Sequence, residues 1–184
     1  INYINSGNME RYVSISDKIG DIYVSIGNTV DAIEYYKIVL ENCKDNKFKC
    51  MKLYEKYIDV YMKLENYKDA LDILNKLVKI YDNEGYMQQK FSYKIFHVIC
   101  CNLLVQDTDN LPRIKNMVIE YIVEYPRIER AEYYKLGVKL IELLENFDER
   151  EFDRMLQEFA VFIDINDKNL LIKIKEKYQN MSLC

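Results

Sequence analysis

The segment 19–33 recurs in modified form as the segment 57–71. The matching positions stand 38 residues apart: Tyr23 and Tyr61, Ile26 and Leu64, Ala32 and Ala70. This interval is slightly longer than the ~34 residues of a tetratricopeptide unit, and such a period is typical of stacked helical repeats. In each copy an apolar stripe with helical spacing is followed by a short polar break and a second stripe. The repeat therefore predicts two successive helix hairpins.

Turn-forming residues set the expected limits of these hairpins. We expect their helices near residues 9–26, 29–44, 48–64 and 67–82. Gly27 and Asn28 supply the first turn, since both tolerate the left-handed geometry of a helix end. Ala32 and Ala70 stand where two helices of a hairpin approach closely, because a methyl group allows nearer backbones than a larger side chain does.

The second half of the chain predicts further helices without a clear repeat. We expect one at 91–105, a partner helix ending near Glu124, two more helices, and a capping helix at about 167–178. Asn110 is the predicted N-cap of the partner helix, with Pro112 in its first turn. Asp148 is the predicted cap of a later helix, and Glu151 is placed to reciprocate it.

These helices predict an all-α fold. Only 5 glycines and 2 prolines occur in 184 residues, which suits long helices with short connections. The expected architecture is a right-handed superhelical stack of tetratricopeptide-like helix hairpins over residues 1–126. Residues 127–184 are expected to form a C-terminal helical cap that continues the stack. Such stacks offer long exposed surfaces and no closed active-site cleft.

Charge, hydropathy and cysteine content narrow the function classes. A net charge of -4 argues against general nucleic-acid binding, which needs clustered cations. The longest apolar stretch, about 98–105, is far shorter than the ~20 residues of a membrane span. The N-terminus does not resemble a signal peptide, and we expect the chain to be part of a longer protein. An odd set of five cysteines indicates reduced thiols and a cytoplasmic setting: Cys43, Cys50, Cys100, Cys101 and Cys184.

Residues for catalysis are scarce, and the sequence predicts no enzyme, no cofactor and no metal. The one histidine, His97, lies among apolar residues and is interpreted as a partly buried helical residue. No nucleophile elbow and no glycine-rich phosphate loop is present. Cys43 and Cys50 lack the second ligand pair that a zinc site requires. The many tyrosines are interpreted as hairpin packing and not as base-stacking residues.

The order of these segments resembles the soluble NSF attachment proteins (SNAP), the alpha type more than the gamma type. The likeness rests on 21–36, on 65–73, and on the tail segments 135–145, 152–159 and 171–175. No single motif carries it, but the shared order extends over nearly the whole chain. The resemblance implies a twisted helical sheet that binds a bundle of SNARE helices and recruits the hexameric ATPase NSF. An unrelated tetratricopeptide-like scaffold for protein–protein interaction is the alternative that the hairpins alone allow.

The resemblance also implies binding residues. The family's acidic C-terminal patch corresponds to Glu142 and Glu145, with Asn146 in place of a third acid. The family's penultimate leucine, associated with stimulating the ATPase, corresponds to Leu183. Lys52 and Lys56 match SNARE-facing lysines and suit an acidic bundle surface.

Two departures from the family pattern stand out. The family's tryptophan before the last helix is absent, as the chain has no Trp. The N-terminal repeats, with their membrane-touching loop, have no counterpart in these residues. We therefore expect a cytoplasmic protein that is peripheral to membranes only through its partners or through an N-terminal part outside these residues.

Overall fold

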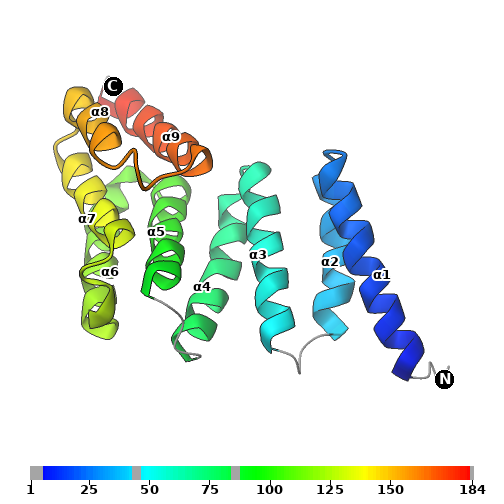
Figure 1. Ribbon diagram of the computed structural model, residues 1–184. Helices are drawn as coiled ribbons and strands as arrows, with labels where there is room; N and C mark the ends of the chain where they lie inside the picture. The colour runs from blue at the N-terminus through cyan, green and yellow to red at the C-terminus, as the bar shows by residue number, and fades with distance from the viewer. Residues whose placement is uncertain (1–5, 43–46, 84–87, 183–184) are drawn as a thin grey trace. The chain divides into compact units, whose positions relative to one another are not determined.

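The structure is a computed structural model that describes residues 6–42, 47–83 and 88–182. Every regular element in these ranges is helical, which confirms the all-α class (Figure 1). The α-helices are α1 (Ser6–Ser25), α2 (Thr29–Asn42), α3 (Lys47–Lys63), α4 (Tyr67–Asn83), α5 (Gln88–Val105), α6 (Leu111–Glu124), α7 (Glu132–Glu145), α8 (Glu149–Glu158) and α9 (Ile165–Ser182). Two short 3-10 helices, Thr108–Asn110 and Pro126–Ile128, precede α6 and α7. No described helix has the length and hydropathy needed to cross a bilayer.

The packing divides the chain into two compact units, residues 1–73 and 74–184. In the first unit α1 packs along α2, and α2 packs against α3. The division predicted near residue 126 and the handedness of the superhelix stay predictions.

The close approach of α1 to α2 depends on a glycine. A Cβ atom at Gly20 would lie 2.4 Å from Cε1 of Tyr36, so any larger residue would displace the ring. Tyr36 is buried and meets Tyr57 of α3 edge to face, with ring centroids 5.8 Å apart. Ala32 and Ala70 are both fully buried, as expected of small residues within hairpins. The tyrosines named here pack in the hairpins, as the sequence predicted.

The two hairpin turns repeat the same hydrogen bonds 38 residues apart. The Asn28 amide donates to the Tyr23 carbonyl and the Asn66 amide to the Tyr61 carbonyl, each at 2.9 Å. In each turn the preceding residue also donates to the carbonyl three positions before it, at 3.1 and 3.2 Å, and the two bonds together form the Schellman ending of a helix. The left-handed residue is Gly27 (φ 81°) in the first turn and Glu65 (φ 57°) in the second.

Asn28 lies in the predicted turn but does not take the left-handed geometry itself. Its φ is not positive; its side chain accepts from the Asp31 amide at 3.3 Å and so caps α2. Asn66 accepts from the Asp69 amide at the same distance and caps α4. Because an asparagine oxygen satisfies a free amide at a helix start, each of these residues begins the next helix.

Substitutions at the two left-handed residues should change the free energy of unfolding in opposite directions. Gly27→Ala should lower the free energy of unfolding by about 1 kcal/mol, because a Cβ atom disfavours positive φ. Glu65→Gly should raise it by up to about 1 kcal/mol. Urea denaturation followed by circular dichroism measures both changes. Equal stability of Gly27→Ala and the parent would contradict the assignment of this turn.

In the second unit α5 is the central helix and contacts α6, α7 and α9 (Figure 1). Eleven of its residues are buried, so it is covered on nearly all sides. Gly137 allows α7 to approach closely, since a Cβ atom there would lie 2.8 Å from Cδ1 of Ile99. Cys100 and Cys101 are fully buried, as predicted.

The helix caps of this unit confirm one prediction and correct another. Asp148 Oδ1 accepts from the amides of Arg150 (2.8 Å) and Glu151 (3.0 Å), so it caps α8 as expected. The Glu151 carboxylate binds Arg154 at 2.6 Å. Asn110 makes no side-chain cap bond, because it ends a 3-10 helix that leads directly into α6.

The last helix is fixed to α5 at its C-terminal half. The Lys177 ammonium donates to the carbonyl oxygens of Leu103 (2.9 Å), Leu104 (3.1 Å) and Gln106. These carbonyls lie at the end of α5, where the helix dipole favours a cation. Burial lowers the pKa of Lys177, opposed by the charge of Asp107.

Candidate functional site

The two predicted acidic residues lie at the C-terminal end of α7. The opposite face of α7 is buried, and Gly137 fixes it close to α5. Glu142 and Glu145 are both exposed and three residues apart, so they share one helix face. Unpaired carbonyl groups at a helix end add partial negative charge. This end of α7 is therefore suited to a cationic partner surface.

The two glutamates differ in how far their charge is compensated. The Lys115 ammonium of α6 binds both carboxylate oxygens of Glu145, at 2.7 and 2.9 Å. Glu142 forms no ion pair with any described residue. Because the Lys115 bridge is solvent-exposed, it contributes little to stability, but it does neutralise Glu145 locally. Glu142 is consequently the stronger candidate for contact with a partner's cation.

Acidic residues continue beyond the end of α7. Asn146, where the family has a third acid, is the exposed residue that ends the helix. Asp148 and Glu149 follow at the start of α8. Asp148 accepts the free amides of α8, and Glu149 lies 3.1 Å from the Lys175 ammonium. Both charges are thus partly used within the chain, and sequence reasoning did not assign either to the patch.

The predicted SNARE-facing lysines, both on α3, have different environments. Lys52 is exposed and forms no ion pair with residues in the described ranges. The Lys56 ammonium, by contrast, lies 2.7 Å from Oδ1 of Asp17 and 2.8 Å from Oδ1 of Asp21. The Tyr36 hydroxyl donates to the same Asp21 oxygen at 2.7 Å. Lys56 therefore joins α3 to α1, and only Lys52 presents an uncompensated charge.

The titration of this network is consistent with a structural role for Lys56. Burial opposes the charged form, but hydrogen bonds to Asp17 and Asp21 outweigh it and raise the pKa of Lys56. For Asp21, burial is likewise outweighed by bonds from Lys56 and Tyr36, so its pKa is lowered. Lys56 and Asp21 are thus both charged near neutral pH, as the bridge between them requires.

His97 lies in a buried polar cluster of the second unit. Its Nε2 atom is 2.9 Å from Oδ1 of Asp167, while its Nδ1 atom has no hydrogen-bond partner among the described residues. The Tyr133 hydroxyl lies 3.2 Å from Oδ2 of Asp167. Burial raises the pKa of Cys100 well above its usual value and that of Cys101 to about 12. His97 and Asp167 are buried, and the cluster joins α5, α7 and α9, so its evident role is packing.

A comparison with family profiles identifies one family. The profile described as "Soluble NSF attachment protein, SNAP" matches residues 1–179. The chain belongs to the SNAP family. Searches of curated proteins and of solved structures found no match for this SNAP-family chain.

Membership of the SNAP family agrees with the resemblance and with the helical fold. The individual binding residues stay predictions. Leu183, the predicted ATPase-stimulating leucine, lies outside the described residues. Of the other four, two belong to the first unit and two to the second.

Sequence reasoning missed the charged partners of two predicted site residues, Lys56 and Glu145. Asp17 and Asp21 lie one helical turn apart on α1, a spacing that could have signalled a bridge to a lysine. Lys115 carried no such signal, because it is 30 residues from Glu145 and meets it only through helix packing.

Proposed function

We propose that this SNAP-family chain is an adaptor that binds SNARE complexes and recruits the NSF-type hexameric ATPase that disassembles them in vesicle trafficking. The observation that supports it most is the family match over residues 1–179. In this proposal the chain itself performs no chemistry. It holds the SNARE bundle and the ATPase together, and the ATPase hydrolyses ATP.

The SNARE side of the proposal rests on Lys52. An exposed lysine that forms no ion pair within the described ranges can approach an acidic helical bundle without breaking a contact of its own. Such a charge acts mainly on steering and register. Lys56 contributes by fixing α3 to α1, which holds Lys52 in place.

The ATPase side rests on the end of α7. Glu142 supplies the uncompensated charge, while Glu145 adds a second carboxylate that shares its charge with Lys115. The buried helix face beneath them keeps both carboxylates on a rigid element. A basic surface on the ATPase is the matching partner chemistry.

Charge reversal of Lys52 tests the SNARE side. Lys52→Glu should weaken binding to an immobilised SNARE bundle about fivefold, because an attractive contact becomes repulsive. The loss should shrink as salt is added, since exposed charges are screened. Biolayer interferometry at two salt concentrations measures both effects.

Lys68→Glu is the matched control, because Lys68 is an exposed lysine of α4 that forms no ion pair with a described residue. It makes the same change of net charge and should leave binding unchanged. Equal binding by the parent and Lys52→Glu would remove Lys52 from the proposed surface. Failure of the unmodified chain to bind the bundle would overturn the SNARE assignment itself.

A further inference from the structure

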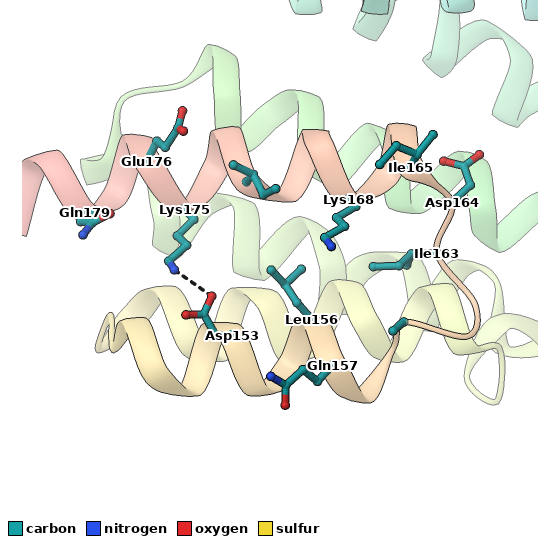
Figure 2. A pocket seen from close by; sticks show the side chains of 12 residues that line it. Asp153, Leu156, Gln157, Ile163, Asp164, Ile165, Lys168, Lys175, Glu176 and Gln179 are labelled. Carbon is teal, nitrogen blue, oxygen red and sulfur yellow. Dashed lines mark hydrogen bonds and ion pairs between the residues drawn. The ribbon is translucent and has the colours of Figure 1, made fainter.

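A groove lies between α8 and α9, with an accessible volume of about 760 Å³ (Figure 2). The residues that line it include Asp153, Leu156, Ile163, Lys168, Ile172 and Lys175. The volume falls in the range of sites that bind ligands or side chains of a partner. Neither Glu142 nor Glu145 lines the groove, so it is separate from the acidic end of α7.

Both walls of the groove are fixed by contacts within the unit. At one end the Lys175 ammonium lies 2.8 Å from Oδ1 of Asp153 and 3.1 Å from Glu149, which joins α9 to α8. Lys177 secures the same helix to the carbonyls of α5. Near the other end, Asp164 Oδ1 accepts from the Asp167 amide at 2.9 Å and caps α9. A groove held in this way is formed before any partner arrives, which lowers the cost of binding.

The apolar surface of the groove continues onto the exposed connection between the helices. Leu156 points from α8 toward α9, and Ile163 points into the same space (Figure 2). Beside them Val161 is 90% exposed, Ile165 67% and Phe162 51%. Large apolar side chains grouped at such exposure are unusual on a soluble surface and mark interaction sites.

The basic and acidic side chains of the groove point to opposite sides. Lys168 and Lys175 reach toward α8, whereas Asp164 and Glu176 point away from it (Figure 2). Lys175 is neutralised by Glu149 and Asp153. Lys168 forms no ion pair with any residue that the structure describes, and its ammonium reaches into the space that Leu156 borders. The open part of the groove therefore offers apolar contacts around one uncompensated cation.

We propose that this groove binds an amphipathic segment of a partner protein that carries an acidic side chain among large apolar ones. The apolar residues contact Leu156, Ile163 and Ile172, and the carboxylate pairs with Lys168. This is the helix-in-groove mode of recognition, in which apolar anchors give affinity and a charge sets the register. The proposal stands apart from the SNARE and ATPase assignments, because it uses none of their residues.

A labelled peptide tests the groove. The probe is a fluorescent helical peptide of about 12 residues with leucines at positions i and i+4 and a glutamate on the same face. Fluorescence anisotropy should show binding to the full chain. Lys168→Glu should weaken binding about tenfold, and a peptide with lysine in place of the glutamate should regain the loss on this variant. Because Lys168 is exposed, the substitution leaves the fold intact.

Two further variants locate the binding. Leu156→Asp should also weaken the peptide about tenfold, and its helicity is checked by circular dichroism. Lys90→Glu, a reversal of an exposed lysine of α5 outside the groove, should have no effect. Absence of peptide binding, or equal binding by Lys168→Glu and the parent, would overturn the proposal.

Other occupants give different results and also overturn it. Binding to vesicles of phosphatidylcholine and phosphatidylserine, without binding to the peptide, would indicate a membrane surface. Sedimentation velocity that shows a dimer, lost in Leu156→Asp, would indicate a second copy of the chain. Monomeric sedimentation together with charge-dependent peptide binding is the result that supports the proposal.

Discussion

Glu142→Lys should weaken recruitment of the ATPase about tenfold, because it reverses the one carboxylate at the end of α7 that no described cation neutralises. Glu145→Lys should weaken recruitment less, since Lys115 already shares the charge of Glu145. Helicity should be unchanged, as both residues are exposed. Binding of the purified ATPase to the immobilised chain measures the difference between the variants.

Two control variants show whether the difference between Glu142→Lys and Glu145→Lys depends on position and not only on net charge. Glu132→Lys makes the same charge change on the same helix, about 15 Å from Glu142, and should leave recruitment unchanged. Lys115→Gln removes the cation beside Glu145 and should strengthen recruitment about twofold, because it restores a free carboxylate. Equal loss in Glu132→Lys and Glu142→Lys would show that only net charge matters, and the acidic-patch assignment would fail.

Asp167→Ala should lower the free energy of unfolding by about 3 kcal/mol, the largest stability change expected here. Asp167 is 1% exposed, and its carboxylate contacts both His97 and Tyr133. Its removal leaves the buried His97 ring without its one hydrogen-bond partner among the described residues, while the Tyr133 hydroxyl keeps its bond to the Phe162 carbonyl. Urea denaturation of the variant and the parent measures the loss.

A double-mutant cycle separates this contact from a general packing defect. His97→Phe with Asp167→Ala should cost at least 1 kcal/mol less than the sum of the single changes, because no polar partner is left unpaired. Asp153→Ala removes an exposed carboxylate of α8 and should cost less than about 1 kcal/mol. Additive losses in the cycle would contradict a direct His97–Asp167 interaction.

The hairpins could be predicted because local patterns determine them. The 38-residue repeat located the first four helices, since apolar spacing and turn residues act within a few positions. The left-handed role of Gly27 followed in the same way. The capping role of Asn28 could not be predicted in this way, because asparagine suits both a helix end and a helix start, and the turn geometry decides between them.

The candidate site was harder to predict, because its electrostatics depend on contacts between distant segments. Glu142 and Glu145 are equivalent in sequence, and only the packing of α6 on α7 brings Lys115 to one of them. Lys52 and Lys56 differ for the same reason, because Asp17 and Asp21 of α1 form ion pairs with Lys56. The buried contact between His97 and Asp167 joins residues 70 positions apart and left no local signal in the sequence.

The most direct test of the adaptor assignment is capture of the ATPase on an immobilised SNARE bundle, with and without this chain. The assignment predicts that the ATPase is retained in the presence of ATP analogues that block hydrolysis only when the chain is added. Glu142→Lys should reduce this retention while leaving the chain itself on the bundle. Retention of the ATPase to the same extent without the chain, or none with it, would contradict the assignment and favour a helical scaffold that binds partners other than SNAREs.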